Sequence, residues 1–167
     1  MSDYFREIPS ISTQGILALP MGDARIATID SEDIAKVAVS LLHSDGHESK
    51  RYELTGPEAL TVEEVAATIS EAIGRPLRYV DIDPDEKSKA MLDVGVPAYF
   101  TDAMHELFSQ RRNGADESRV NLSTHQTFGV RPTTFAEFTR RHADVFSGER
   151  SVTHASKSGW RSQAIWN

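Results

Sequence analysis

The sequence contains no cysteine. Disulfide bonds, thiolate metal sites and cysteine nucleophiles are therefore excluded. No apolar run approaches the ~20 residues that a membrane-spanning helix needs. The first ten residues, MSDYFREIPS, contain no apolar signal core. We therefore expect a cytoplasmic protein that does not use a membrane as its partner.

The sequence is also poor in positive charge. The 167 residues carry a formal net charge of −7 and are 39% apolar, which is somewhat low for a globular protein. Nucleic acids and anionic membranes select for clustered Lys and Arg, so an acidic chain disfavours both as partners. The one basic cluster, residues 140–142, lies beside acidic residues in a predicted helix, which favours a solvated helix face.

Two motifs of nucleotide-dependent redox enzymes are missing. The ten glycines never fall into a G-x-G-x-x-G pattern, so no glycine-rich turn aims backbone N–H groups at a pyrophosphate. The sequence also has no Tyr-x-x-x-Lys pair. We therefore predict that this chain alone binds no cofactor and is not a self-sufficient NAD(P)-dependent reductase.

Residues 51–82 read as strand, helix and strand. The first strand is expected at 51–55 and the second at 77–82, where apolar and polar residues alternate. Between them, Thr61 and Glu64 have the spacing of a capping box, and Gly74 stands where helices commonly stop. The apolar stripe of this helix is predicted to be Val62, Val65, Ala66, Ile69 and Ile73. Such a unit is typical of a layered α/β protein.

The N-terminal third is expected to hold fewer regular elements. Residues 1–14 look like an irregular lead-in, and two short apolar runs at 15–29 predict a strand pair or a strand and loop, with a strand at 24–29. A helix capped by Asp30 or Ser31 should follow. Its apolar face at the helical period is Ile34, Val37, Ala38, Leu41 and Leu42.

The C-terminal part is predicted to be helical. One helix begins at Pro84 after the cap residue Asp83, a second occupies 96–113, and a third begins at a capping box in 134–137. The polar residues 148–167 are expected to form a disordered or loosely docked tail. The prediction is one α/β domain at 1–147 (α+β by content), with a small sheet of short strands covered by about five helices.

Four segments together carry a family resemblance. They are GILALPMGDARIATIDSEDIAKVAVSLL, YELTGPEALTVEEVAATISEAIGRPLRYVDI, GVPAYFTDAMHELF and GVRPTTFAEFTRRHADVF, in this order. In this combination the chain resembles the C-terminal half of the NmrA-like proteins, atypical members of the short-chain dehydrogenase/reductase superfamily. The resemblance implies that the N-terminal Rossmann half, which binds NAD(P) in that family, is not part of this chain. NAD(P) is thus implied by the family only.

The candidate ligand site lies in the helix at 96–113. Tyr99, Phe100, Met104 and Phe108 are spaced along one helix face and could line an apolar pocket. Plain core packing explains the same spacing, and the two readings are compatible. The resemblance implies that this region closes over the substrate. His105 is the candidate general base, since histidine titrates near neutrality, although a half-buried structural histidine is the alternative.

Two further pairs have simpler explanations. Asp30 and Asp33 could form a polar wall of a pocket, but their position at a helix entry favours capping and complementarity to the helix dipole. His43 and His47 are four residues apart, which is a metal-ligand spacing only when both lie on one helix. Because residues 44–46 should end that helix, we expect no metal site.

The sequence alone leaves three functions open. The first is a small-molecule binding or biosynthetic protein without its own cofactor loop, with a possible cofactor-independent cyclase or isomerase activity. The second is a split subunit of an NAD(P)H-dependent oxidoreductase that a Rossmann-containing partner chain completes. The third is a non-catalytic regulatory or interaction module. Because the expected strands at 24–29 and 51–55 need partners, we predict a homo-oligomer or a partner chain.

Overall fold

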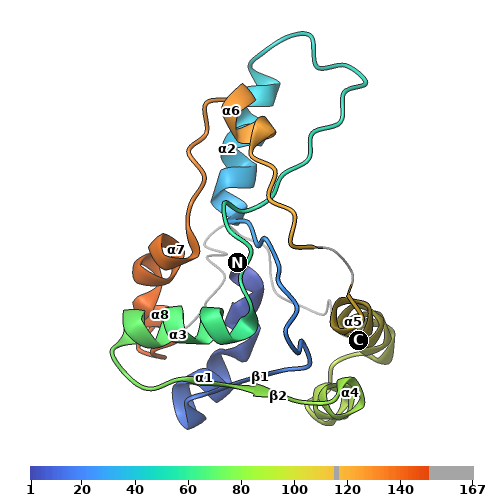
Figure 1. Cartoon of the computed structure of the whole chain (residues 1–167), viewed down its shortest axis with the longest axis vertical. Helices are drawn as coiled ribbons and strands as arrows, with labels where there is room; N and C mark the ends of the chain where they lie inside the picture. Colours follow the sequence, from blue (N-terminus) through green and yellow to red (C-terminus); the bar gives the residue numbers. More distant parts are fainter. Residues whose placement is uncertain (115–116, 151–167) are drawn as a thin grey trace, which may run out of the picture.

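A computed structural model describes residues 1–114 and 117–150. The fold is α/β, with a small two-stranded parallel sheet at one end of an elongated molecule and helices around it (Figure 1). The elements in chain order are η1 (Ser2–Glu7, a 3-10 helix), α1 (Ile8–Gln14), β1 (Ile16–Leu19), α2 (Ser31–Leu42), α3 (Val62–Ile73), β2 (Arg78–Asp81), α4 (Pro84–Asp93), α5 (Ala98–Arg112), α6 (Ser123–Thr127), α7 (Phe135–Arg141) and α8 (Ala143–Phe146).

The sheet joins two segments that are far apart in the sequence. β1 and β2 run parallel, in a register that pairs Ile16 with Arg78 and Leu19 with Asp81. Parallel strands need a crossover connection, and this one contains α2 and α3. Leu17 and Leu19 point into the core from alternate positions of β1. α1 packs on β1 and α3 packs on β2, so helices cover the short sheet.

The largest fully buried side chains of the core are aromatic. Phe135, Phe138 and Phe146 are each at most 2% exposed, and they come from α7 and α8, which pack on α3. The ring of Phe5 stacks on Phe138 with 5.5 Å between centroids. Aromatic pairs at this spacing add about 1 kcal/mol beyond their buried area. This cluster fixes the N-terminal helical segment, and therefore one wall of the site described below.

The helix boundaries follow the predicted capping signals. The capping boxes of α3 (Thr61 and Glu64) and α7 (Thr134 and Glu137) are both formed. Gly74 adopts the left-handed conformation at the end of α3, with φ of 67°. Four of the predicted α3 stripe residues are buried, and Ile73 packs partly buried against the same core. The Asp83 and Asp30 caps of α4 and α2 are confirmed as well.

The α7 capping box makes one pH prediction. The Thr134 backbone N–H, the Arg131 guanidinium and the Thr134 hydroxyl lower the pKa of Glu137 to about 2. Since this lies below the unfolded value of about 4.3, the stabilisation is complete above about pH 5 and is lost as the pH falls from about 4 toward 2. We expect Glu137→Gln to lower the Tm near neutral pH, and the difference from wild type to shrink over that interval in thermal unfolding scans.

A control belongs with this variant. Glu63→Gln removes an exposed first-turn carboxylate from α3 that is not the capping-box residue. Its difference from wild type should show little of the same acid dependence. A Glu137→Gln difference that stays constant from neutral to acid pH would contradict the assignment.

The prediction of an irregular N-terminus was wrong. Residues 2–14 form η1 and α1. Pro9 occupies the first turn of α1, where its missing N–H costs nothing, and Gly15 ends the helix with φ of 65°. Tyr4 and Ile11 are buried at helical spacing, so tertiary burial stabilises a segment whose local sequence gives a weak signal.

Two predicted strands are also absent from the described structure. Residues 24–29 form one isolated antiparallel bridge, between Ile26 and Leu60. The segment opposite includes Pro57, which has no N–H to extend a ladder. Residues 51–55 are irregular. Side chains satisfy their backbone instead, because the Thr124 hydroxyl donates to the Glu53 carbonyl oxygen at 2.5 Å.

The apolar face predicted for α2 is only partly buried. Val37 is buried together with Asp33, one turn before it. Ile34 is 42% exposed and Leu42 is 84% exposed, and Ala38 between them is exposed too. The core side of α2 is therefore the narrow Asp33–Val37 edge, and Ile34, Ala38 and Leu42 form an exposed line that we call the α2 stripe. His142 also interrupts the predicted last helix, which splits into α7 and α8.

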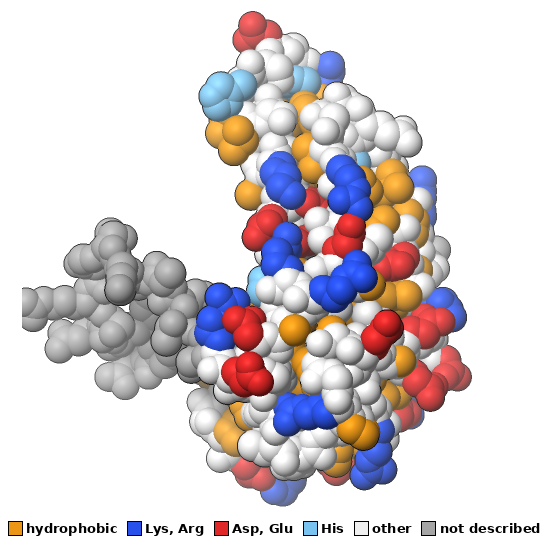
Figure 2. Space-filling view, turned by 90° about the vertical axis from the view of Figure 1, so that its left-hand side faces the viewer, with side chains coloured by type: hydrophobic (Ala, Val, Ile, Leu, Met, Phe, Trp, Pro, Cys, Tyr) orange, Lys and Arg blue, Asp and Glu red, His pale blue; other side chains and the backbone are white. Residues whose placement is uncertain are grey.

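The predicted C-terminal tail falls mostly on residues 151–167, which lie outside the described residues. In the ranges that are described, no helix combines the length and the apolar character needed to cross a membrane. On the face drawn in Figure 2, acidic and basic side chains are interspersed, and apolar side chains reach the surface between them.

Candidate functional site

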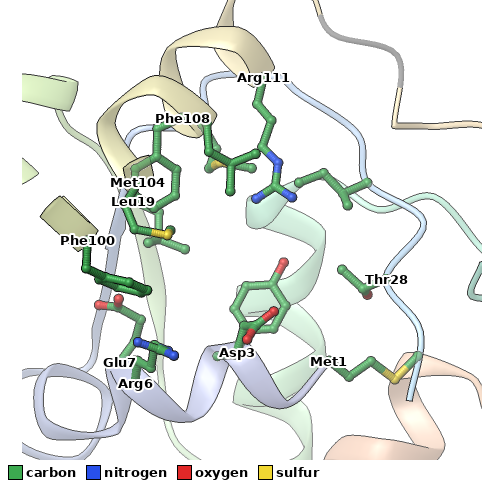
Figure 3. A pocket seen from close by; sticks show the side chains of 14 residues that line it. Met1, Asp3, Arg6, Glu7, Leu19, Thr28, Phe100, Met104, Phe108 and Arg111 are labelled. Carbon is green, nitrogen blue, oxygen red and sulfur yellow. The ribbon is translucent and has the colours of Figure 1, made fainter. Parts of the chain in front are cut away.

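The candidate site is a cavity of about 300 Å³ between the N-terminal helical segment, the end of β1 with the residues after it, and α5 (Figure 3). Its walls are mainly apolar. The apolar lining residues are Met1, Leu19, Met21, Ile26, Phe100, Met104, Leu107 and Phe108. A concave, mostly apolar cavity of this size with a few polar groups is typical of small-molecule sites.

α5 supplies one complete wall. Phe100, Met104, Leu107 and Phe108 recur at spacings of three and four residues, so they share one helix face. In Figure 3 the labelled Phe100, Met104 and Phe108 descend from α5 along one side of the cavity. Phe108 is 5% exposed and belongs to the core, whereas Met104 is only partly buried against it. The wall is therefore anchored at its C-terminal end and more open toward Phe100.

Two of the charged lining residues, Arg111 and Glu7, form ion pairs. Arg111, at the end of α5, donates from Nε and Nη2 to the carboxylate of Glu117 over 2.7–3.1 Å. Glu7 accepts from Lys87 Nζ at 2.8 Å. Because these pairs neutralise each other, neither Arg111 nor Glu7 presents a lone charge to the cavity.

The remaining polar lining residues are Asp3, Tyr4, Arg6 and Thr28. Arg6 lies over the Phe100 ring, with 5.1 Å from its guanidinium carbon to the ring centroid. Tyr4 is 8% exposed, and its ring packs edge-on against Phe135. Burial raises the pKa of Tyr4 to about 12, although the nearby Arg111 charge works in the opposite direction. Tyr4 is therefore a neutral phenol at physiological pH.

The structure brings together three of the five predicted site residues. Phe100, Met104 and Phe108 line the cavity. Tyr99 points away, is 72% exposed and is not part of the lining. His105 lies on the α4 side of α5, where its Nε2 atom is 2.9 Å from the Asp85 carboxylate. The described geometry therefore gives His105 an exposed partner on α4 instead of a place in the cavity.

Sequence reasoning missed the opposite wall. Tyr4 and Arg6 come from the segment predicted to be irregular, and Leu19 and Thr28 come from two other places in the chain. The spacing of Tyr4, Ile8 and Ile11 is a helical signal that was available in the sequence. Nothing in the local sequence indicates that this helix faces α5.

A second, broader hollow of about 520 Å³ lies beside the sheet. Asp81 is its centre and accepts from the Gly22 N–H at 3.0 Å and from Arg112 Nη1 at 2.6 Å. The Arg112 bond outweighs the effect of burial and lowers the pKa of Asp81. The Tyr79 hydroxyl lies 3.0 Å from the same carboxylate. These groups satisfy one another and tie the sheet to the end of α5, so we assign the hollow a structural role.

The other candidate pairs also have structural partners. Asp30 caps α2 by accepting from the Glu32 N–H at 3.1 Å and forms an ion pair with Arg141. Arg141, from the basic cluster read as a solvated face, thus has a definite partner. Burial opposes ionisation of Asp33, but hydrogen bonds from Lys36 and from the Thr133 N–H and hydroxyl outweigh it and lower its pKa.

The two histidines considered for a metal have other partners. His47 Nδ1 is 2.6 Å from the Tyr52 hydroxyl and its Nε2 is 2.8 Å from Ser44. His43 Nδ1 is instead 2.8 Å from the Val39 carbonyl oxygen. Across residues 1–114 and 117–150, no three side chains of the metal-binding types gather around a common point.

Comparison with known proteins places the chain in a family. The model of the NmrA-like family matches residues 4–139. An NAD(P)H azoreductase of Xenophilus azovorans is 41% identical over 147 residues, which cover 87% of this chain and 51% of that protein. A (4-alkanoyl-5-oxo-2,5-dihydrofuran-3-yl)methyl phosphate reductase of Streptomyces griseus is 34% identical over 89% of this chain and 52% of its own length.

A comparison with solved structures gives the same relationship as these sequence matches. An NADPH-dependent quinone oxidoreductase from Escherichia coli superposes with a TM-score of 0.72 at 25% identity, over 84% of this chain and 50% of that one. The chain thus spans about half the length of the relatives it matches. The extent of the family match and the identity to the azoreductase lead to one conclusion: this chain belongs to the NmrA-like family, whose oxidoreductase-like fold it shares.

Proposed function

We propose that this chain is the substrate-binding, C-terminal half of an NAD(P)H-dependent reductase that acts on a small, largely apolar molecule. The observation that carries the proposal is the 300 Å³ cavity, which α5 lines with Phe100, Met104 and Phe108. The names of the relatives, an azoreductase and a quinone oxidoreductase among them, support reduction as the reaction. The ligand of this cavity would be the molecule that is reduced.

The residues of this chain do not fit a dinucleotide. A pyrophosphate needs the free N–H groups and positive end of a helix, reached through a glycine-rich turn. Here the first turns of α2, α3 and α4 carry carboxylates, two in each helix, and these repel phosphate. The first turn of α5 carries no carboxylate, but Pro97 and not a glycine-rich turn leads into it. We therefore infer that a nucleotide-binding Rossmann half supplies NAD(P)H, and that this chain binds and orients the acceptor.

The test is equilibrium binding to the chain alone. Isothermal titration calorimetry should detect a naphthoquinone probe, because its apolar rings match the cavity walls, and should detect no NADPH. Adding a separately produced nucleotide-binding half of the Xenophilus azoreductase should then give NADPH-dependent reduction of the same probe. Binding of NADPH by the chain alone would contradict the division of roles, and absence of probe binding would contradict the substrate site.

A cofactor-independent cyclisation or isomerisation is less well supported. Such a reaction needs an acid–base group against the ligand. His105, the sequence candidate for that role, pairs with Asp85 outside the cavity lining. No observation favours a purely regulatory role over the reductase either, so reduction remains the function we propose.

The α2 stripe supports a protein partner. Ile34, Ala38 and Leu42 repeat every four residues and therefore form one line along the helix. Their exposure, up to 84% for Leu42, leaves apolar surface in water, and such surface commonly marks an interface. We propose that the stripe contacts either a second copy of this chain or the nucleotide-binding half.

This proposal predicts a change in association. We expect light scattering coupled to size exclusion to report a species larger than a monomer for the chain alone, or a stable complex once a nucleotide-binding half is added. Ile34→Lys combined with Leu42→Lys should weaken either species by at least about tenfold, because two charges would be buried without partners. Gln14→Lys, at an exposed position on α1, is the control. If the double variant associated as strongly as the wild type, the α2 stripe would not be the interface.

A further inference from the structure

Tyr4 has an unusual position for a buried tyrosine. Its ring is anchored against Phe135 with 5.5 Å between centroids, and the side chain lines the cavity. Buried phenols ordinarily find a hydrogen-bond partner. None of the hydrogen bonds within residues 1–114 and 117–150 involves the Tyr4 hydroxyl, and its oxygen is not among the fully enclosed polar atoms that lack a partner. Because Tyr4 lines the cavity, its hydroxyl is a donor that a ligand there can reach.

Arg111 presents a second donor to the same space. Glu117 holds its Nε and Nη2 atoms, while Nη1 has no acceptor among the described residues. Figure 3 shows the Arg111 guanidinium reaching from the end of α5 toward the middle of the cavity. Tyr4 and Arg111 both line the cavity, and the Arg111 charge lowers the Tyr4 pKa against the larger effect of burial.

We propose that the Tyr4 hydroxyl donates a hydrogen bond to an acceptor atom, such as a carbonyl oxygen, of a planar and otherwise apolar ligand. Arg111 Nη1 lies at the same end to support that atom. The inference rests on the proposed function and adds the chemistry of the ligand and the residue that orients it. Neither Tyr4 nor Arg111 was recognised as a site residue in the sequence.

The charges around the cavity favour a neutral ligand. Glu117 offsets the positive charge of Arg111, and Lys87 offsets the negative charge of Glu7. Of the other charged lining residues, Asp3 places a negative charge near Tyr4 and Arg6 lies over the Phe100 ring. A carboxylate or sulfonate beside Tyr4 would therefore meet the Asp3 charge and an Arg111 that Glu117 already neutralises. A carbonyl oxygen needs only donors, and the neutral Tyr4 phenol is one. A ligand that accepts there also has its electron density drawn toward that oxygen, which makes the attached carbon more electrophilic.

Infrared difference spectroscopy tests this on the intact chain. The probe is naphthoquinone, isotope-labelled at its carbonyl carbons, and the readout is the carbonyl stretching band together with the Kd from calorimetry. In the wild type we expect one band at lower frequency than for the free probe, as a hydrogen bond produces. In Tyr4→Phe the band should move back toward the frequency of the free probe and the Kd should rise about tenfold, the loss of one hydrogen bond of about 1.4 kcal/mol.

The matched control is Tyr99→Phe. It removes the same hydroxyl from a residue that is 72% exposed and outside the lining, so band and Kd should stay as in the wild type. Thermal unfolding should show Tyr4→Phe to be folded, since the ring that packs on Phe135 is retained. An unshifted Kd and an unchanged band in Tyr4→Phe would overturn the Tyr4 inference while the substrate site stands. A probe that binds none of the three proteins would overturn the proposed function, and the inference with it.

Discussion

Replacing Gly56 with alanine is expected to destabilise the fold by about 3 kcal/mol, the upper part of the range for overpacking. A Cβ atom at this position would lie 1.9 Å from the carbonyl oxygen of Thr28 and 2.7 Å from its carbonyl carbon. Both are backbone atoms, so no rotamer change can relieve the clash. For a chain of this size the loss corresponds to a Tm lower by roughly 6–12 °C in thermal unfolding.

The same contact explains why Gly56 concerns the site. The Gly56 N–H donates to the Ala27 carbonyl oxygen at 3.1 Å, and the adjacent Thr28 is part of the cavity wall. Pushing the two segments apart would therefore move that wall. We expect Gly56→Ala to weaken binding of the naphthoquinone probe as well as to unfold at lower temperature.

Gly74→Ala is the appropriate control. Gly74 has φ of 67° but nothing within 4 Å of the added methyl group, so the change costs only the strain of a left-handed residue, about 1 kcal/mol. Gly74 is not part of the cavity lining, and probe binding should be unchanged. If both variants lost the same stability, close backbone packing at Gly56 would not be the cause.

Local signals in the sequence were sufficient for the elements that carry their own caps. α3 was predicted at its observed place because Thr61, Glu64 and Gly74 mark both ends and the apolar stripe between them has one period. The capping box at Thr134 likewise located the start of α7. In these helices the local preference and the tertiary packing agree, so the sequence alone decides the structure.

The wrong predictions concern segments whose structure depends on tertiary contacts. α2 has a regular apolar face, yet the fold buries Asp33 because its carboxylate accepts from the N–H and the hydroxyl of Thr133, 100 residues away. The periodicity of apolar residues along a helix cannot reveal a buried carboxylate whose partner is that distant in the sequence. Residues 51–55 have strand-like composition, but a strand forms only when a neighbour offers a ladder. There the contacts pair side chain with backbone instead: the Thr124 hydroxyl donates to the Glu53 carbonyl oxygen, and the Asn121 N–H donates to the Thr55 hydroxyl.

The candidate site also has a part that the sequence predicted and a part that it did not. Its α5 wall was visible because Phe100, Met104 and Phe108 lie on one helix and repeat at its period. The opposite wall combines Tyr4 with Thr28, which no periodicity relates. Tyr99 was assigned to the same face, but it lies about 100° around the helix from Phe100, on the side away from the cavity, where it is 72% exposed.

Met104→Trp is expected to raise the Kd of the naphthoquinone probe at least about 100-fold, a loss near 2.7 kcal/mol. Met104 lines the cavity and is only partly buried against the core. A larger indole at this position therefore extends into the cavity of about 300 Å³ instead of displacing core residues. Because the cavity would be occupied, binding is lost by exclusion, while the free energy of unfolding changes by less than about 1.5 kcal/mol.

The adjacent residue provides the control for Met104→Trp. Ala103→Trp adds an indole to the same helix at an exposed position, so it should change neither probe binding nor stability beyond the small cost of helix propensity. Binding of the probe is measured by calorimetry on both variants, and folding by thermal unfolding. If Met104→Trp bound the probe as tightly as Ala103→Trp, the ligand would lie elsewhere, and the cavity beneath α5 would lose its role as the substrate site.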